Sequence, residues 1–315
     1  MLESMELADT GRTTTRLGFG CSGLMGGISE KESLLLLETA YEEGIRHFDV
    51  APSYGHGQAE RCLGKFLRGK PDVTITTKYG IQAPARAGLL EVVRTAVRPL
   101  ARRFPGIRAR AAARVAGLKR KAQFSAAEGR ASLEHSLREL GVERVDLWLL
   151  HEPSPEDLTG SDLLPLLSEL RQAGKIGSYG VGAERSRVEG IWETHREFCP
   201  VLQYEWSILD LNATRFSPAF RIQHRAISGA LPALRTAMER DPEICRRWSD
   251  AVEADLSQAD TCAALLMGLA LLRNAGGMVL FSSRDPAHIR AIAQSAGAEN
   301  WRLRASRFNH LLQSS

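Results

Sequence analysis

Residues 44–78 read GIRHFDVAPSYGHGQAERCLGKFLRGKPDVTITTK. Two runs rich in apolar and β-branched residues, 45–50 and 73–78, flank a stretch of helical period at 59–67. A strand, a helix and a second strand in this order are typical of a βαβ unit, in which the two strands lie parallel. This segment therefore predicts the repeating unit of an α/β fold.

The same alternation continues along the whole chain. Helix-like segments separate the expected strands, and glycines such as Gly141 and Gly174 stand where two of these helices should end. Eight repeats in 315 residues favour a closed (β/α)₈ TIM barrel, although an open doubly wound sheet has the same periodicity. The expected strands are residues 17–20, 45–50, 73–78, 145–150, 176–181, 201–204, 221–227 and 278–281.

Three segments stand apart from this repeat. Residues 5–17, MELADTGRTTTRL, predict a β-hairpin around the turn DTG, placed before the first barrel strand. Residues 85–122 form a long basic insert after the third strand, with eleven Arg or Lys against one acidic residue. The pattern at 231–258 is irregular and assigns no clear element. We expect one domain over residues 1–315, with the insert on the face where the strands end.

Composition excludes several classes of protein. The chain is 43% hydrophobic and 25% charged, as in soluble globular proteins, and its longest uncharged apolar run, 262–272, is shorter than the about 20 residues of a transmembrane helix. Its first residues are acidic, unlike a secretory signal, and its five cysteines form no C-x-x-C pair. The net charge of +4 depends on one basic segment, so nucleic acid is not an expected partner. We expect a cytoplasmic protein, whose oligomeric state the sequence does not determine.

Polar side chains stand where three neighbouring expected strands end. Asp49 and Tyr54 follow the second strand, Lys78 ends the third, and His151 follows the fourth. Because the carboxyl ends of barrel strands form the catalytic face, these four side chains are expected in one space. Each type alone is more often structural, as a cap, a solvated amine or a core ring. Together they indicate a site.

This set of side chains suits the protonation of a carbonyl oxygen. A phenol has a reference pKa of about 10, and a neighbouring ammonium is expected to lower the pKa of Tyr54 by stabilising the phenolate. Asp49 would fix the ammonium of Lys78 in place. His151 would orient the substrate carbonyl through a hydrogen bond.

The same motifs carry a family resemblance. The chain resembles the aldo-keto reductase superfamily over most of its length. The resemblance is carried by FDVAPSYG, by the pairs AE and LG within 59–64, by TTK and by VDLWLLH. The resemblance implies a (β/α)₈ barrel, a nicotinamide nucleotide that is usually NADPH, and reduction of a small aldehyde or ketone to an alcohol. By position, the resemblance implies that Tyr54 donates the proton, that Asp49 and Lys78 adjust the pKa of Tyr54, and that His151 orients the carbonyl.

The resemblance also implies contacts with the nucleotide. In VLQYEWSILD, Gln203 is expected to hold the nicotinamide carboxamide and Trp206 to stack on its ring. In HRAISGAL, Ser228 is expected near the pyrophosphate. In VLFSSRDPAHIR, Ser283 precedes a helix whose N–H groups favour a phosphate, and Arg284 would pair with the extra phosphate of NADP(H). NADP(H) is therefore the expected cofactor, and NAD(H) is not excluded.

The chain departs from the family pattern at several positions. Gly182 and Ala183 stand where the family commonly has a Ser-Asn pair for the carboxamide. Ala291 and Ile292 stand where it often has residues that grip adenine, and HRAISGAL lacks the usual proline. These differences leave the expected chemistry intact, but they leave the affinity for the nucleotide and the NADP(H) preference open.

Two alternative functions and one substrate hypothesis remain. The altered nucleotide positions also fit a non-catalytic sensor or partner subunit that binds a nucleotide without turnover. Asp49, His151 and Glu152 resemble a metal-dependent hydrolase, but no H-x-H or H-E-x-x-H occurs and Lys78 disfavours a cation, so no metal is expected. The insert at 85–122 suggests either a solvated helical hairpin or a lid that attracts an anionic or carrier-bound carbonyl substrate.

Overall fold

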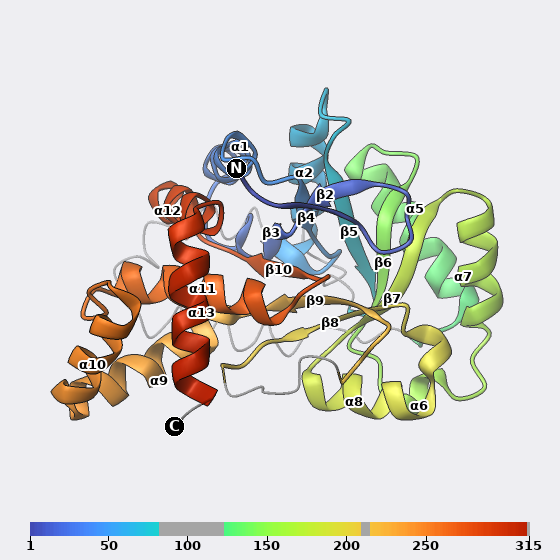
Figure 1. Ribbon diagram of the computed structural model, residues 1–315. Helices are drawn as coiled ribbons and strands as arrows, with labels where there is room; N and C mark the ends of the chain where they lie inside the picture. Colours follow the sequence, from blue (N-terminus) through green and yellow to red (C-terminus); the bar gives the residue numbers. More distant parts are fainter. Residues whose placement is uncertain (82–122, 209–214, 314–315) are drawn as a thin grey trace, which may run out of the picture.

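A closed barrel of parallel strands forms the centre of the molecule. The computed structural model describes residues 1–81, 123–208 and 215–313, and within them the strand order is β10-β3-β4-β5-β6-β7-β8-β9 (Figure 1). The strands are β3 (Leu17–Gly20), β4 (His47–Asp49), β5 (Thr74–Tyr79), β6 (Val145–His151), β7 (Ile176–Gly182), β8 (Val201–Glu205), β9 (Phe220–His224) and β10 (Met278–Phe281). The predicted (β/α)₈ barrel is confirmed. Because β10 pairs with β3 and closes the ring, the open sheet is excluded.

Helices alternate with these strands and cover the outside of the barrel (Figure 1). The helices are α1 (Glu30–Glu42), α2 (Ala59–Leu67), α5 (Ala126–Leu140), α6 (Pro155–Leu158), α7 (Leu163–Gln172), α8 (Arg185–Thr194), α9 (Ala226–Arg240), α10 (Pro242–Val252), α11 (Ala259–Arg273), α12 (Pro286–Ala296) and α13 (Glu299–Gln313). Helix α1 begins with a capping box between Ser29 and Glu32. Helix α5 ends at Gly141, whose φ of 66° is left-handed, as the sequence predicts.

Two sequence expectations differ from the structure in the last third of the chain. Most of the irregular stretch 231–258 is helical, in α9 and α10. Helix α9 continues through Pro232 in its interior, and Asp241 caps the start of α10. The seventh strand ends at His224 rather than at residue 227, since Arg225 turns into a left-handed conformation with φ of 60°. The basic insert at 85–122 lies outside the described residues.

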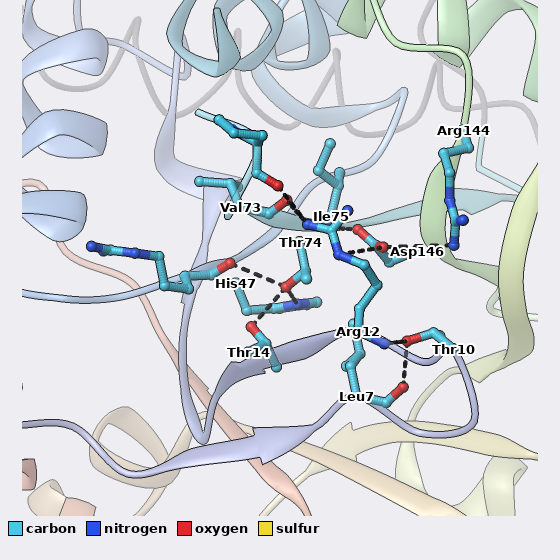
Figure 2. A network of polar contacts seen from close by, with 12 residues as sticks. Leu7, Thr10, Arg12, Thr14, His47, Val73, Thr74, Ile75, Arg144 and Asp146 are labelled. Atoms are coloured by element: carbon cyan, nitrogen blue, oxygen red, sulfur yellow. Dashed lines mark hydrogen bonds and ion pairs between the residues drawn. The ribbon is translucent and has the colours of Figure 1, made fainter. Parts of the chain in front are cut away.

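The predicted hairpin is present at the amino end of the barrel. Strand β1 (Ser4–Glu6) pairs antiparallel with β2 (Thr13–Thr15). The Arg12 guanidinium donates to two carbonyl oxygens just before β5, at 2.8 and 3.1 Å. The buried Asp146 carboxylate accepts the N–H of Ile75 at 2.8 Å and lies 3.9 Å from Nε of Arg12 (Figure 2). These contacts attach the hairpin to the start of β5 and to β6.

Polar side chains continue from this hairpin toward the interior of the barrel. Oγ1 of Thr14 lies 2.7 Å from Oγ1 of Thr74, which lies 2.9 Å from Nδ1 of His47 (Figure 2). The other ring nitrogen of His47 lies 3.0 Å from Oγ1 of Thr76. Burial, and then the positive charge of Lys78, lower the pKa of His47 to about 3, so its ring is neutral. A separate cluster of buried apolar side chains fills the space between β6, β8, β9, β10 and the hairpin: Leu7, Leu147, Leu149, Val201, Ile222, Met278 and Leu280.

Candidate active site

A large cavity opens at the carboxyl ends of the barrel strands. Its volume is about 1010 Å³, and its wall runs from the tips of β4, β5 and β6 to the starts of α9, α11 and α12. One end of the wall contains the four side chains predicted for catalysis: Asp49, Tyr54, Lys78 and His151. Helix α12 contributes another part of the wall, through His288, Ala291, Ile292 and Ser295.

Asp49, Lys78 and Tyr54 meet through direct contacts. Nζ of Lys78 lies 2.5 Å from Oδ1 of Asp49 and 3.3 Å from Oη of Tyr54. The first contact follows from the barrel, because β4 and β5 are paired neighbours and both side chains lie near the ends of their strands. Asp49 is 4% exposed and Lys78 is 2% exposed. The structure therefore brings these three predicted residues together in a largely buried cluster.

A tight turn places Tyr54 over this ion pair. Tyr54 begins a short 3₁₀ helix (Tyr54–Gly57), and Gly55 has a left-handed φ of 55°. A Cβ at Gly55 would lie 2.6 Å from both the carbonyl oxygen of Leu24 and the Cβ of Met25. Only glycine permits this close packing between the loop after β4 and the loop after β3. The packing holds the phenol beside Lys78.

Burial changes the expected electrostatics of Tyr54. Burial raises the pKa of Tyr54 above its usual value of 10, and this effect is larger than the lowering by the Lys78 ammonium. For Lys78, burial lowers the pKa, but the attraction of Asp49 and the contact with Tyr54 outweigh it, so the pKa is raised. Lys78 lowers the pKa of Tyr54, as predicted, but burial outweighs this effect and the net shift of the pKa is upward. At neutral pH the phenol keeps its proton and the amine keeps its charge.

His151 lies beside the phenol at the end of β6. The two rings are 6.1 Å apart between centroids and nearly perpendicular, at 86°. The backbone that follows β5 comes very close to His151: a Cβ at Gly80 would lie 2.2 Å from the carbonyl oxygen of His151. Gly80 has a φ of 147°, so glycine lets the chain leave β5 without displacing β6. His151 therefore joins the predicted group on the same cavity wall.

Gln203 connects the catalytic cluster to β8. Its Nε2 donates to Oδ2 of Asp49 at 2.8 Å, and the side chain is buried. Asp49 thus binds Lys78 with one oxygen and Gln203 with the other. A Cβ at Gly182 would lie 3.0 Å from Oε1 of Gln203, so the glycine in β7 leaves room for this amide. Gln203 lines the cavity, and its contact with the nucleotide stays a prediction.

The other predicted nucleotide contacts fall into two groups. Ser228 and Ser283 line the cavity. Trp206 is 3% exposed within the apolar core and is not among the described residues that line the cavity. Nη2 of Arg284 donates to the carbonyl oxygen of Gly26 at 3.3 Å, and Arg284 is also absent from the described lining. The roles expected of Trp206 and Arg284 stay predictions.

Comparison with known proteins identifies the family. The model of the Aldo/keto reductase family matches residues 16–221, which is more than half of the chain. The chain belongs to the aldo/keto reductase family. It is 28% identical to pyridoxal 4-dehydrogenase from Microbacterium luteolum over 91% of each chain. It is also 32% identical over 185 residues to D-threo-aldose 1-dehydrogenase from Pseudomonas sp, a match that covers 56% of this chain and 52% of that protein.

A solved structure supports the fold of this aldo/keto reductase. The holo form of an aldo-keto reductase from Bacillus halodurans has a TM-score of 0.70 to this chain. The match covers 98% of this chain and 96% of the other, at 18% sequence identity. At this identity the likeness concerns the barrel fold alone.

Two cavity residues of this aldo/keto reductase were not singled out from its sequence. His224 ends β9 and lines the cavity, and the exposed Arg225 follows it. Burial, then the positive charges of Lys78 and Arg225, lower the pKa of His224 to about 4, so its ring is neutral. The sequence could have indicated His224 by its position at the end of a strand. It did not, because the strand was expected to continue to residue 227.

Acidic side chains line the wall beyond His151. Glu152, Glu184 and Glu205 follow β6, follow β7 and end β8, respectively. Both carboxylate oxygens of Glu205 accept the N–H of Arg185 at 3.1 Å, and Glu152 accepts the N–H of Glu184 at 3.4 Å. These two carboxylates thus cap the start of α8. The described wall here is acidic, whereas the sequence suggested a positive approach from the insert.

The described parts of the chain lack two kinds of feature. No helix there is long and apolar enough to span a bilayer. No group of three or more His, Cys, Asp or Glu side chains there is arranged to hold a metal ion. The five cysteines are all free thiols.

Proposed function

We propose that this protein catalyses the nicotinamide-dependent reduction of an aldehyde or ketone to an alcohol, and the reverse oxidation. The observation that carries the proposal is the 3.3 Å contact between Oη of Tyr54 and the buried ammonium of Lys78 on the cavity wall. A protonated phenol beside a fixed positive charge is a suitable acid for a carbonyl oxygen. Membership in the aldo/keto reductase family and the dehydrogenase names of two relatives support this class of reaction.

The residues of the cavity fit a nicotinamide dinucleotide. Helix α9 begins after Arg225, which makes no side-chain capping hydrogen bond to the start of the helix. Arg225 is exposed and lines the cavity. A helix start and a guanidinium both favour an anion such as a pyrophosphate. The cavity also reaches Tyr54 and α12, which leaves space for the two ends of a dinucleotide.

Four side chains would carry the proton chemistry, while the bound nucleotide supplies or accepts the hydride. Tyr54 holds a proton at neutral pH and delivers it from Oη to the carbonyl oxygen. The Lys78 ammonium, 3.3 Å away, stabilises the phenolate that remains. Asp49 keeps that ammonium charged and in place at 2.5 Å. His151 orients the carbonyl oxygen toward the phenol by a hydrogen bond.

Removing a single hydroxyl tests the proposal. We expect Tyr54→Phe to lower kcat by about 10²- to 10⁴-fold, because the general acid is lost. The nucleotide Kd, measured by fluorescence titration, should stay within about twofold of the value for the natural protein, because nucleotide binding involves no proton transfer. Turnover is measured as the loss of reduced-nucleotide absorbance with a panel of aldehydes and ketones.

A second tyrosine provides the matched control. Tyr41 on α1 bonds Asp72 at 3.0 Å and lies outside the described cavity lining, so Tyr41→Phe should keep full turnover. Full turnover by Tyr54→Phe would refute the assigned acid. Nucleotide binding with no turnover of any carbonyl would instead favour the non-catalytic sensor.

Two finer expectations from the sequence stay proposals, and a third, the preference for NADP(H), competes with a preference for NAD(H). An anionic or carrier-bound substrate would depend on the basic insert, because the described wall carries Glu152, Glu184 and Glu205. A cytoplasmic location rests on the pattern of the cysteines. The preference for NADP(H) rests on Arg284, whose guanidinium contacts a loop carbonyl oxygen.

A further inference from the structure

Two helix starts on the cavity differ in charge. Helix α9 begins after the cavity-lining Arg225 and has no side-chain cap. Helix α12 begins after Asp285, whose Oδ1 accepts the N–H of Ala287 at 2.8 Å. The hydroxyl of the cavity-lining Ser283 accepts the N–H of Asp285 at 3.1 Å, which fixes this cap at the edge of the cavity. Both helices pack against α11 (Figure 1).

The shape of the cavity assigns the two helix starts to different parts of a dinucleotide. In the proposed function, the nicotinamide lies beside Tyr54 and the pyrophosphate near Arg225. The part of the cavity lined by α12, through His288 and Ala291, is then left for the adenosine half. Asp285 is itself not among the described lining residues, but Oδ2 of its carboxylate lies 3.9 Å from Nε2 of the cavity-lining His288. The start of α12 therefore lies beside the half in which NAD(H) and NADP(H) differ.

The charge presented at the start of α12 is negative. The Asp285 side chain is 52% exposed, and its Oδ2 lies 3.9 Å from Nε2 of His288. The adjacent Arg284 donates to the carbonyl oxygen of Gly26. The carboxylate already occupies the positive end of the helix, where an anion would otherwise be favoured.

We propose that Asp285 makes the protein select NAD(H) over NADP(H), an inference that rests on the proposed function. The two nucleotides differ by one phosphate on the adenosine ribose. A carboxylate accepts a hydrogen bond from a ribose hydroxyl, but it repels a phosphate that carries almost two negative charges. The competing expectation is that Arg284 leaves Gly26 and binds this phosphate. That expectation predicts the opposite preference.

Titration of the full chain with NADH and with NADPH tests the selectivity without any substrate. From nucleotide fluorescence, we expect a Kd for NADH that is at least about tenfold lower than that for NADPH. Asp285→Asn keeps a side-chain cap but removes the charge. It should lower the Kd for NADPH about tenfold and change that for NADH less than about twofold. A residue that only held α12 in place would change both values alike.

Two further variants complete the experiment. Asp241→Asn is the matched control, because Asp241 caps α10 before Pro242 as Asp285 caps α12, and α10, unlike α12, contributes no residue to the described cavity lining. It should not change the ratio of the two Kd values. Arg284→Ala should not change the ratio either.

Three results would overturn the inference. The first is tighter binding of NADPH than of NADH by the natural protein, most clearly if Arg284→Ala abolished this preference. The proposed function would still stand after that result. An unchanged ratio in Asp285→Asn would also refute the role of the carboxylate. Binding of neither nucleotide would overturn the proposed function together with this inference.

Discussion

The cavity has two halves that are built in different ways. In the half proposed for catalysis, called the catalytic half below, side chains of the barrel strands and of the loop after β4 already bind one another: Asp49 contacts Lys78 and Gln203, and Lys78 contacts Tyr54. In the half proposed to hold the nucleotide, called the nucleotide half below, the wall comes mainly from helix starts and loops, and the charged Arg225 is exposed. The side chains of the catalytic half are preorganised by contacts with one another. The nucleotide half presents groups that are available to bind a ligand.

Burial explains this difference. A charge removed from water is costly unless an opposite charge and hydrogen bonds compensate it, so the catalytic half needs complementary side chains in contact. The nucleotide half is lined by the exposed Arg225 and by the start of α9, and backbone N–H groups at helix starts depend less on side-chain identity. Substitutions should therefore affect folding most in the catalytic half, whereas in the nucleotide half they should mainly affect affinity and selectivity.

Breaking the buried ion pair should have the largest effect on stability. Lys78→Met leaves the Asp49 carboxylate buried without its ammonium, and the loss of one partner from a buried pair costs about 3–5 kcal/mol. Chemical denaturation at pH 7 should show this loss as a lower midpoint with an unchanged slope.

An exposed ion pair supplies the control for that comparison. Lys65 lies 2.7 Å from Glu30, and both side chains are 43% exposed. Lys65→Met should cost no more than about 1 kcal/mol, because water and salt screen the pair. Equal losses for Lys65→Met and Lys78→Met would refute the importance of burial.

A buried carboxyl group behind the catalytic half should have the next largest effect. Glu60 on α2 is 2% exposed and accepts the hydroxyl of Thr77 at 2.6 Å, and burial raises the pKa of Glu60 from 4.5 to about 6. The folded protein thus binds this proton more tightly than the unfolded chain does. The ionised carboxylate therefore destabilises the fold above about pH 6, and this cost disappears as the pH falls to 4.5.

Glu60→Gln removes this cost at high pH. The variant should be about 2 kcal/mol more stable than the natural protein at pH 8, and the difference should vanish near the lower of these pKa values. Denaturation curves at several pH values measure it. A difference that does not change with pH would contradict the assigned pKa shift.

Changes in the nucleotide half should have smaller effects. His224→Ala removes a neutral ring from the cavity wall, and an aromatic contact is worth about 0.5–1.5 kcal/mol. The nucleotide Kd should therefore rise about two- to tenfold with little loss of stability. Trp206→Phe, a change in the core, should leave the Kd within about twofold. The reverse ranking would favour the stacking role that the sequence suggested for Trp206.

The most regular parts of the fold were predictable from sequence. Buried strands and amphipathic helices differ in hydrophobic period, so the barrel strands and the turn at Gly141 could be recognised. Asp49, Lys78 and His151 could be grouped because each stands near the end of a strand. Helices α9 and α10 were not recognised because their apolar pattern is interrupted by Pro232 and by charged residues.

The electrostatics of the site and part of its wall could not be predicted. The pKa of Tyr54 depends on the sum of burial and neighbouring charges, and burial is the largest cause of its rise. Trp206 and Arg284 stand in motifs that suggest a ligand, yet their side chains are directed to the core and to a loop carbonyl oxygen. His224 lines the cavity because the chain turns at Arg225, three residues earlier than expected.

Local pattern alone accounts for the order of strands and helices, for the hairpin and for the residue types at the first strand ends. These features depend on periodicity and turn residues within a few positions of the chain. Only the folded arrangement accounts for the closure of β10 on β3, the burial of Asp49 with Lys78, and the opposite charges at the starts of α9 and α12. These features depend on residues far apart in the chain, and on how much water the fold removes from each charged group.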